Sequence, residues 1–361
     1  MKNGTFYIFN GANSKFQKND EPIRDLLAGE ILVGIAYATI CGSDIHTFCG
    51  IREEATPSIL GHEIVGKVLS LNSEGANLDA LGKTISIGDR ITWTVYASDP
   101  NTNVYNPDVP QKNQDLYKYG HRRLTDGDDF NGGLATHIIL RPHTVVRVLP
   151  DDLPLQVAAT INCAIATAAG AIRLAGESCG KRVVISGMGL LGLTIVSMFK
   201  EAGANEIIVS DVQPERLKLA KAFAADVTIN TNDVSLQEYM ESQCKTADIY
   251  VDMSGVPEAM EQGIAALGVN GRAVLVGAVF KQHKISLDAE NIIRKLITIR
   301  GLHNYNYEDF NFAVDFMVNQ WKNYPFQDLI EKEFHFDEVD IAFEFAVSNK
   351  PIRVGINQNL S

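Results

Sequence analysis

The chain has 361 residues, of which 45% are hydrophobic and 21% charged, a composition typical of globular proteins. Its 32 Lys and Arg against 44 Asp and Glu give a formal charge of −12, which argues against a nucleic acid or an anionic membrane as partner, because either would favour a basic surface. The length exceeds the roughly 250–300 residues of a single core, so two domains are expected. Five cysteines, an odd number, favour reduced thiols in the cytoplasm over a disulfide framework.

The first 150 residues predict a β-rich domain of short strands separated by turn signals. Turns are indicated at Gly88-Asp89 and at Asn131-Gly132-Gly133. The segment 99–129 is polar and without periodicity, so we expect a long surface excursion there. The predicted strands are 31–40, 64–71, 91–95 and 134–140.

From about Asp151 the pattern changes to strands that alternate with helical segments, which predicts a parallel, doubly wound sheet. The predicted strands are 182–187, 206–211, 227–230, 248–255 and 272–277, with helices at 190–204, from Pro214, 235–244 and 257–267. After His303 a helix at 308–321, a strand-like EKEFHF and a helix from Asp337 are expected. The apolar run 183–196 contains three glycines and is flanked by charges, so we expect no membrane span.

A glycine-rich turn follows the strand that ends near residue 186. The stretch Gly187-Met188-Gly189-Leu190-Leu191-Gly192 is G-x-G-x-x-G, and it opens a helix. Glycines in this pattern permit a tight turn, a close approach of pyrophosphate to the backbone, and close helix–strand packing. The free N–H groups of the helix N-terminus then face the diphosphate.

Asp211 stands nineteen positions after the last of these glycines, at the end of the next predicted strand. An acidic residue there binds the ribose hydroxyls of NAD and repels the 2′-phosphate of NADP. The sequence therefore predicts an NAD site. The alternative interpretation is a glycine-rich turn between two ordinary elements.

Two cysteines and a histidine form a candidate metal constellation. Cys41 ends a predicted strand, His62 follows twenty-one residues later, and Cys163 directly precedes the nucleotide-binding part of the chain. Thiolate and imidazole are suitable zinc ligands, and catalytic zinc keeps three protein ligands and one open position. Taken singly, each of the three is also explained as a buried packing or hydrogen-bonded core residue.

Together these motifs resemble the zinc-dependent alcohol dehydrogenases of the medium-chain dehydrogenase/reductase superfamily, nearly end to end. The resemblance is carried by C-G-S-D-x-H at 41–46, G-H-E-x-x-G at 61–66, G-D-R at 88–90, Cys163 and the glycine-rich turn. It implies a GroES-like β-rich catalytic domain at 1–164 and 302–361, and a Rossmann NAD-binding domain at 165–301. It also implies a homodimer or homotetramer joined edge to edge through the Rossmann sheets.

The resemblance implies a role for each matching residue. Cys41, His62 and Cys163 match the catalytic zinc ligands, and Glu63 the acidic residue beside the metal. Further matches are Asp44 as the carboxylate that orients the histidine ligand, Ser43 and His46 as the proton relay, Thr167 beside the nicotinamide, Arg216 on the adenosine-ribose side and Arg353 on the cofactor phosphates.

The chain departs from many relatives at a second, structural zinc site. The four cysteine positions of that site correspond here to Asp99, Thr102, Tyr105 and Asn113. Since no thiolate remains, we expect one catalytic zinc and no structural zinc. We also expect the polar lobe that carries these positions to be held by hydrogen bonds and packing, and to be comparatively mobile.

A narrower resemblance, to alcohol dehydrogenases of phosphonate metabolism, is carried by Gln111-Lys112, by residues 116–121 and by residues 299–305. It implies a substrate such as 2-hydroxyethylphosphonate or phosphonoacetaldehyde. A phosphonate needs cationic donors, and solvated loop charges are the alternative interpretation of the candidates. These candidates are Lys118, His121, Arg122, Arg123, Arg294 and Lys295.

The sequence thus predicts reversible, zinc-assisted hydride transfer between a small alcohol or aldehyde and NAD in a cytoplasmic enzyme. A polyol, amino-alcohol or general alcohol dehydrogenase of the same superfamily is the alternative within this reaction class. A non-catalytic NAD-binding scaffold is the alternative outside it, although the complete set of metal ligands argues against that interpretation.

Overall fold

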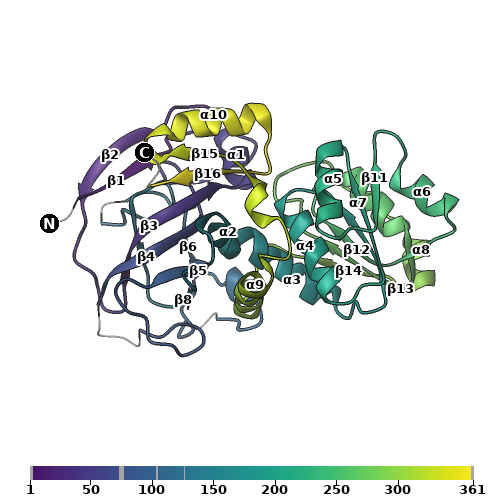
Figure 1. The fold of residues 1–361 in the computed structure, drawn as a ribbon, viewed down its shortest axis with the longest axis horizontal. Helices are drawn as coiled ribbons and strands as arrows, with labels where there is room; N and C mark the ends of the chain where they lie inside the picture. The colour runs from purple at the N-terminus through teal and green to yellow at the C-terminus, as the bar shows by residue number, and fades with distance from the viewer. Residues whose placement is uncertain (1–2, 73–76, 103–104, 126, 359–361) are drawn as a thin grey trace. The chain divides into compact units, whose positions relative to one another are not determined.

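The computed structural model describes residues 3–72, 77–102, 105–125 and 127–358. The chain divides into two compact units (Figure 1). The first comprises Met1–Ala166, Asn306–Lys322 and Phe326–Ser361, and the second comprises Thr167–Tyr305 with Asn323–Pro325. The C-terminal segments therefore fold back onto the N-terminal unit. The predicted domain limits at 164/165 and 301/302 stay a prediction.

The first unit is built on a mainly antiparallel sheet in the order β15-β16-β3-β4-β5-β6, with β7 paired to β3 and β8 to β5. A separate antiparallel pair, β1 with β2, begins the chain. The strands are β1 (Asn3–Ile8), β2 (Gln17–Pro22), β3 (Ile31–Ile40), β4 (Glu63–Leu71), β5 (Arg90–Ala97), β6 (Tyr117–Lys118), β7 (His137–Leu140), β8 (Thr144–Val148), β15 (Ile330–His335) and β16 (Arg353–Asn357).

Helices cover this sheet and enclose its core. Figure 1 shows α10 lying along β15 and β16. Trp93, Val33 and Phe343 are among the buried side chains of the large apolar cluster inside the unit. The helical segments are α1 (Gly42–Phe48), η1 (Pro110–Lys112), α2 (Leu155–Thr160), the π-helical turn η2 (Ile161–Ile165), α9 (Tyr307–Gln320), η3 (Phe326–Leu329), η4 (Phe336–Glu338) and α10 (Val339–Asn349).

The second unit is a parallel sheet in the order β11-β10-β9-β12-β13-β14, flanked by helices. This strand order, with crossovers through helices, is the doubly wound arrangement predicted from the sequence. The strands are β9 (Arg182–Ser186), β10 (Glu206–Asp211), β11 (Val227–Asn230), β12 (Ala247–Asp252), β13 (Leu267–Leu275) and β14 (Thr298–Gly301). The helices are α3 (Ala166–Ala175), α4 (Leu190–Glu201), α5 (Pro214–Ala222), α6 (Leu236–Ser242), α7 (Pro257–Ala265) and α8 (Ala289–Lys295).

The run Leu155–Ala175 is long and apolar enough to cross a membrane by length and composition, with a mean hydropathy of 1.5. Of its most apolar stretch, 78% is buried inside the protein. Burial against other elements is what a core helix of a globular domain shows, so this run does not by itself indicate a membrane span.

An ionic cluster anchors the segment around residues 117–128 to the first unit. The Glu30 carboxylate accepts from the Arg24 guanidinium at 2.7 and 2.9 Å and from Arg141 at 2.5 Å. Arg141 also binds Asp128, which accepts a 2.6 Å hydrogen bond from the Tyr117 hydroxyl. Glu30 is only 1% exposed, so its charge depends on these partners.

These partners lower the pKa of Glu30. Burial alone would raise it, but the hydrogen bonds from Arg24 and the Leu27 N–H and the charges of Arg24 and Arg141 outweigh burial. A carboxyl with a depressed pKa in the folded state contributes stability above its unfolded value, here about 4.5, and loses it as pH falls through the folded value.

We expect Glu30→Gln to lower the free energy of unfolding at pH 7 by about 3 kcal/mol, because it removes the buried carboxylate that pairs with Arg24 and with Arg141. The variant should also lose less stability than the wild type as pH falls below about 4.5. Urea unfolding at several pH values measures both effects. Glu53→Gln, on an exposed side chain, is the control. A wild-type pH dependence in Glu30→Gln would contradict the assignment.

Candidate functional site

The structure brings Cys41, His62 and Cys163 together in the first unit. Their ligand atoms, two sulfurs and an imidazole nitrogen, all lie within 4.8 Å of one another. Ligands on a tetrahedral zinc with bonds of about 2.0–2.3 Å lie roughly 3.5–4 Å apart, so a small closure brings these atoms onto one ion. Cys41 and His62 are buried and Cys163 is half-buried.

Local structure fixes the first ligand. Cys41 follows the last residue of β3 and caps α1, and its backbone N–H donates to Asp44 Oδ2 at 3.0 Å. The same carboxylate lies 3.2 Å from His62 Nδ1 through its Oδ1. Asp44 therefore holds both ligand segments, and it leaves His62 Nε2 as the nitrogen available to a metal.

Cys163 lies on an irregular stretch of helix. The π-helical turn η2 interrupts the run from α2 to α3, and such turns re-aim side chains and occur often at functional sites. Asn162, also in this turn, accepts a hydrogen bond from the Ile64 N–H at 3.3 Å. This contact ties the turn that carries Cys163 to the strand that follows His62.

A buried ion pair borders the cluster. Arg353 Nε donates to Glu63 Oε2 at 2.9 Å, and Nη2 lies 3.2 Å from Oε1 and 3.7 Å from the Cys41 sulfur. Glu63 also accepts from the Thr39 hydroxyl at 2.5 Å. Burial raises the pKa of Glu63 to about 7, against the opposing effect of the Arg353 charge. The predicted contact of Arg353 with cofactor phosphates stays a prediction.

The electrostatics of the three donors suit a divalent cation. A hydrogen bond from Cys163, together with the charges of Arg353 and His62, holds the pKa of Cys41 well below its usual value despite burial. Burial alone would lower the pKa of His62, but Asp44 and Cys41 raise it to about 10. A site that gathers a thiolate and a carboxylate around a proton-holding imidazole exchanges that proton for a metal ion.

Ser43 and His46 both lie on α1, three residues apart and so on one side of the helix. The Ser43 hydroxyl is 3.4 Å from His62 Nε2, beside the candidate ligand atom. Burial lowers the pKa of His46, so its imidazole is neutral near pH 7 and able to accept a proton.

Of the six candidate anion-binding residues, Lys118 and His121 lie near the ligands. The rings of His121 and His62 are 4.8 Å apart, and Lys118 lies close enough for the charge of Cys163 to raise its pKa. Arg122 instead binds Asp128 and stacks on Tyr117. Arg294 belongs to the second unit, where it pairs with Glu290 on α8.

The predicted nucleotide turn has the geometry its glycines require. Gly187 has a φ of +92°, and a Cβ on Gly192 would lie 1.9 Å from the Gly187 carbonyl oxygen. A Cβ on Gly189, in contrast, would meet no atom within 4 Å, so the backbone is open there to a pyrophosphate. Leu190 and Leu191 begin α4, whose first N–H groups have no helical acceptor.

Asp211 ends β10 beside this turn. Its Oδ2 accepts from the Met188 N–H at 2.6 Å and its Oδ1 from the Gln213 N–H at 2.8 Å. The carboxylate thus lies against the glycine-rich turn, as the predicted ribose contact requires. Thr167 lies in the first turn of α3 and Arg216 in α5, and their predicted roles stay predictions.

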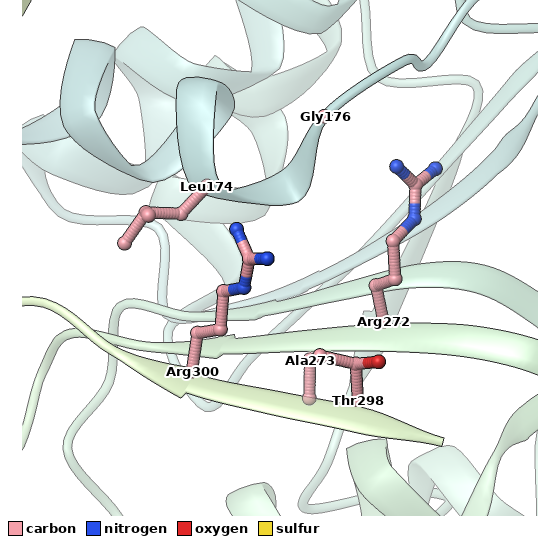
Figure 2. A pocket seen from close by; sticks show the side chains of 6 residues that line it. All are labelled: Leu174, Gly176, Arg272, Ala273, Thr298 and Arg300. Carbon is pink, nitrogen blue, oxygen red and sulfur yellow. The ribbon is translucent and has the colours of Figure 1, made fainter. Parts of the chain in front are cut away.

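A hollow of about 180 Å³ opens elsewhere in the second unit. Figure 2 shows Arg272 and Arg300 rising from β13 and β14 toward the chain that follows α3. Arg272 donates to the Glu177 carbonyl oxygen at 2.6 Å, and cationic groups stabilise the carbonyl end of a helix. We therefore interpret Arg272 as structural. The hollow is lined by Leu174, Gly176, Arg272, Ala273, Thr298 and Arg300.

Comparison with known families agrees with this geometry in both units. Residues 27–151 match the alcohol dehydrogenase GroES-like domain, and residues 191–319 match the zinc-binding dehydrogenase family. The chain belongs to the zinc-binding alcohol dehydrogenases of the medium-chain dehydrogenase/reductase superfamily. The predicted fold class, a GroES-like domain with a Rossmann sheet, is thereby confirmed.

Individual relatives of this dehydrogenase act on different alcohols. It is 27% identical to the D-arabitol-phosphate dehydrogenase of Enterococcus avium, covering 91% of this chain and 90% of that one. It is 28% identical to the L-threonine 3-dehydrogenase of Pyrococcus furiosus, covering 90% of each. A crystal structure of an alcohol dehydrogenase from Thermotoga maritima superposes with a TM-score of 0.92 at 28% identity, covering 99% of this chain and all of that one.

Hydrogen bonds connect the positions where many relatives carry structural-zinc cysteines. Asn113 donates to the Ser98 hydroxyl at 2.7 Å and accepts from the Asn106 N–H at 2.9 Å. Thr102 donates to the Asp99 carbonyl oxygen at 3.2 Å. The absence of a structural zinc from this dehydrogenase, and the mobility of the lobe, stay predictions.

Sequence reasoning missed three polar residues around the site. Thr39 binds Glu63, while Arg52 and His121 share the carboxylate of Glu54 at 2.5 and 3.0 Å. No motif marks these residues, because the contacts of Thr39 with Glu63 and of Glu54 with His121 join segments that are distant along the chain.

We expect Cys163→Ala to reduce bound zinc from about one ion per chain to a small fraction of that, because two donors remain of three. Elemental analysis of the purified protein measures the loss. Cys244→Ala, on an exposed cysteine, is the control and should retain the metal. Full zinc in Cys163→Ala would overturn the ligand assignment, and about two zinc ions per wild-type chain would overturn the prediction of a single site.

A second prediction concerns the ion pair. Arg353→Met should lower the free energy of unfolding by about 3–5 kcal/mol, because it leaves the buried Glu63 charge unpaired. In the double variant Arg353→Met/Glu63→Gln the loss should be smaller, since no uncompensated carboxylate remains. Denaturant unfolding in chelator separates this effect from zinc content. Additive effects of the two substitutions would show that the pair is not coupled.

Proposed function

We propose that this dehydrogenase interconverts a small alcohol and the corresponding carbonyl compound with NAD, using one zinc ion held by Cys41, His62 and Cys163. The observation that carries the proposal is the convergence of three ligand atoms within 4.8 Å, from three separate segments of one unit. Two thiols and one imidazole leave a position of tetrahedral zinc open for the substrate.

Zinc bound there would supply a Lewis acid for the alcohol oxygen, and NAD bound at the glycine-rich turn would accept the hydride. The Ser43 hydroxyl, beside His62 Nε2, takes the proton that the alcohol oxygen loses and passes its own to His46. His46 receives it because burial keeps its imidazole neutral, and then releases it to solvent.

Further residues orient the zinc ligands and select the cofactor. Asp44 orients the His62 ring through Nδ1. Glu63 is the acidic residue next to the ligand set, and the Arg353 guanidinium, which also contacts Cys41, neutralises the charge of the Glu63 carboxylate. On the cofactor side, the open backbone at Gly189 and the Asp211 carboxylate support NAD over NADP, because a 2′-phosphate would meet that carboxylate.

For the substrate we propose a hydroxyalkylphosphonate such as 2-hydroxyethylphosphonate, with phosphonoacetaldehyde as its oxidised form. Lys118 and His121 near the ligands support an anionic alcohol. Polyols and amino alcohols are the second candidate class, because the relatives named above act on a polyol phosphate and on threonine.

NADH absorbance across a substrate panel tests both classes. We expect kcat/KM for 2-hydroxyethylphosphonate to exceed that for 1-propanol, sorbitol and threonine by at least about tenfold, the equivalent of one charge-assisted hydrogen bond. The same panel with NADP tests cofactor choice. A preference for ethanol or sorbitol would remove the phosphonate proposal, and no NAD-dependent oxidation of any alcohol would remove the wider one.

We also propose a cytoplasmic homodimer or homotetramer with the domain limits predicted from the sequence. Exposed apolar side chains near the edge strand β14 support self-association: Val269 is 74% exposed, Ile293 71% and Leu296 67%. Light scattering of the purified protein tests the oligomeric state, and a monomer at micromolar concentration would contradict this part of the proposal.

A further inference from the structure

Lys118 carries a half-buried positive charge. It ends β6, which pairs with β5 through Tyr96 and Ala97. Within the described residues no carboxylate lies in ion-pair contact with its ammonium and no hydrogen bond to it is made. Burial, and after it the charge of Arg52, lowers the pKa of Lys118 to about 8, so most of it is still protonated at neutral pH.

The nearby carboxylate is already used. Glu54 Oε1 contacts Arg52 Nη2 at 2.5 Å and His121 Nδ1 at 3.0 Å. Glu54 carries one negative charge and already pairs with Arg52, so the Lys118 ammonium is left without an ion-pair partner of its own among the described residues.

The segment that carries Lys118 packs directly on a zinc-ligand segment. Gly120 has a φ of +73°, and a Cβ there would lie 2.3 Å from the Gly61 carbonyl oxygen and 3.2 Å from His62 Cβ. His121 continues this contact through its ring, 4.8 Å from that of His62. The backbone thus fixes the position of Lys118 relative to the site where the alcohol oxygen would bind.

The proposed metal site supplies no counter-charge for Lys118. Two thiolates would balance the two charges of a zinc ion, so no net negative charge would be left there for the ammonium. A half-buried ammonium without a counter-ion is costly, and a ligand that supplies the counter-ion recovers this cost on binding.

We propose that Lys118 is a specificity-determining residue that binds an oxyanion on the substrate. The inference rests on the proposed function and names the group that selects the substrate. The oxyanion is a phosphonate, phosphate or carboxylate, attached to the carbon chain that bears the reacting hydroxyl. A neutral alcohol leaves the ammonium unpaired and is disfavoured.

Calorimetry with unreactive analogues tests this without turnover. Ethylphosphonate and propionate carry the oxyanion but no hydroxyl, and each is titrated into zinc-loaded protein. We expect Lys118→Met to weaken ethylphosphonate binding about 10- to 100-fold and Lys118→Arg to restore most of it, as loss and return of a charge-assisted hydrogen bond do. Lys67→Met removes the same charge from an exposed site on β4 and should leave binding unchanged. Melting temperatures and zinc content of the variants confirm that each is folded and loaded.

The outcomes separate the two proposals. Equal binding of both analogues to wild type and Lys118→Met overturns the inference, whatever the enzyme oxidises. Binding of propionate alone, lost in Lys118→Met, supports the oxyanion site and overturns the phosphonate substrate. Lys118-dependent binding in a protein that oxidises no alcohol with NAD supports the site and overturns the proposed function.

Discussion

Charge neutralisation in the interior of the first unit is the constraint on which the rest of the site depends. A thiolate, a carboxylate and an imidazole meet where water is excluded, and each would be costly there alone. The guanidinium of Arg353 contacts both Glu63 and Cys41, and it reaches them from the last strand of the chain. The fold-back of the C-terminal segment is therefore part of the metal site, since without it the two acidic groups lose their cation.

The same kind of charge neutralisation recurs elsewhere in the unit. Asp128 and Arg141 form an ionic cluster with the buried Glu30 that holds the segment around Tyr117 to the sheet. Hydrogen bonds such as that from Asn113 to Ser98 connect the described residues of the neighbouring polar lobe. Such contacts are individually weak unless they are buried and shared, which is the case for Glu30.

Much of this could be predicted from sequence because it is local. The strand-like run 31–40 predicted β3 with the same limits, and the glycine spacing at 187–192 predicted the turn after β9. The contacts between Arg353 and Glu63 and between His121 and Glu54 join distant residues, so no window of the chain contains them. The hairpin of β1 and β2 was also missed, since Gln17–Pro22 is polar and largely exposed.

The π-helical turn that carries Cys163 sets the direction in which its thiol points from the helix axis. Each residue of an α-helix advances the side-chain direction by about 100°, so one residue more or fewer within Ile161–Ile165 would swing the thiol away from Cys41 and His62. The flanking helices α2 and α3 would keep their own hydrogen bonding. A chain of this fold can thus lose its metal through a change of helical register alone, with every ligand residue still present.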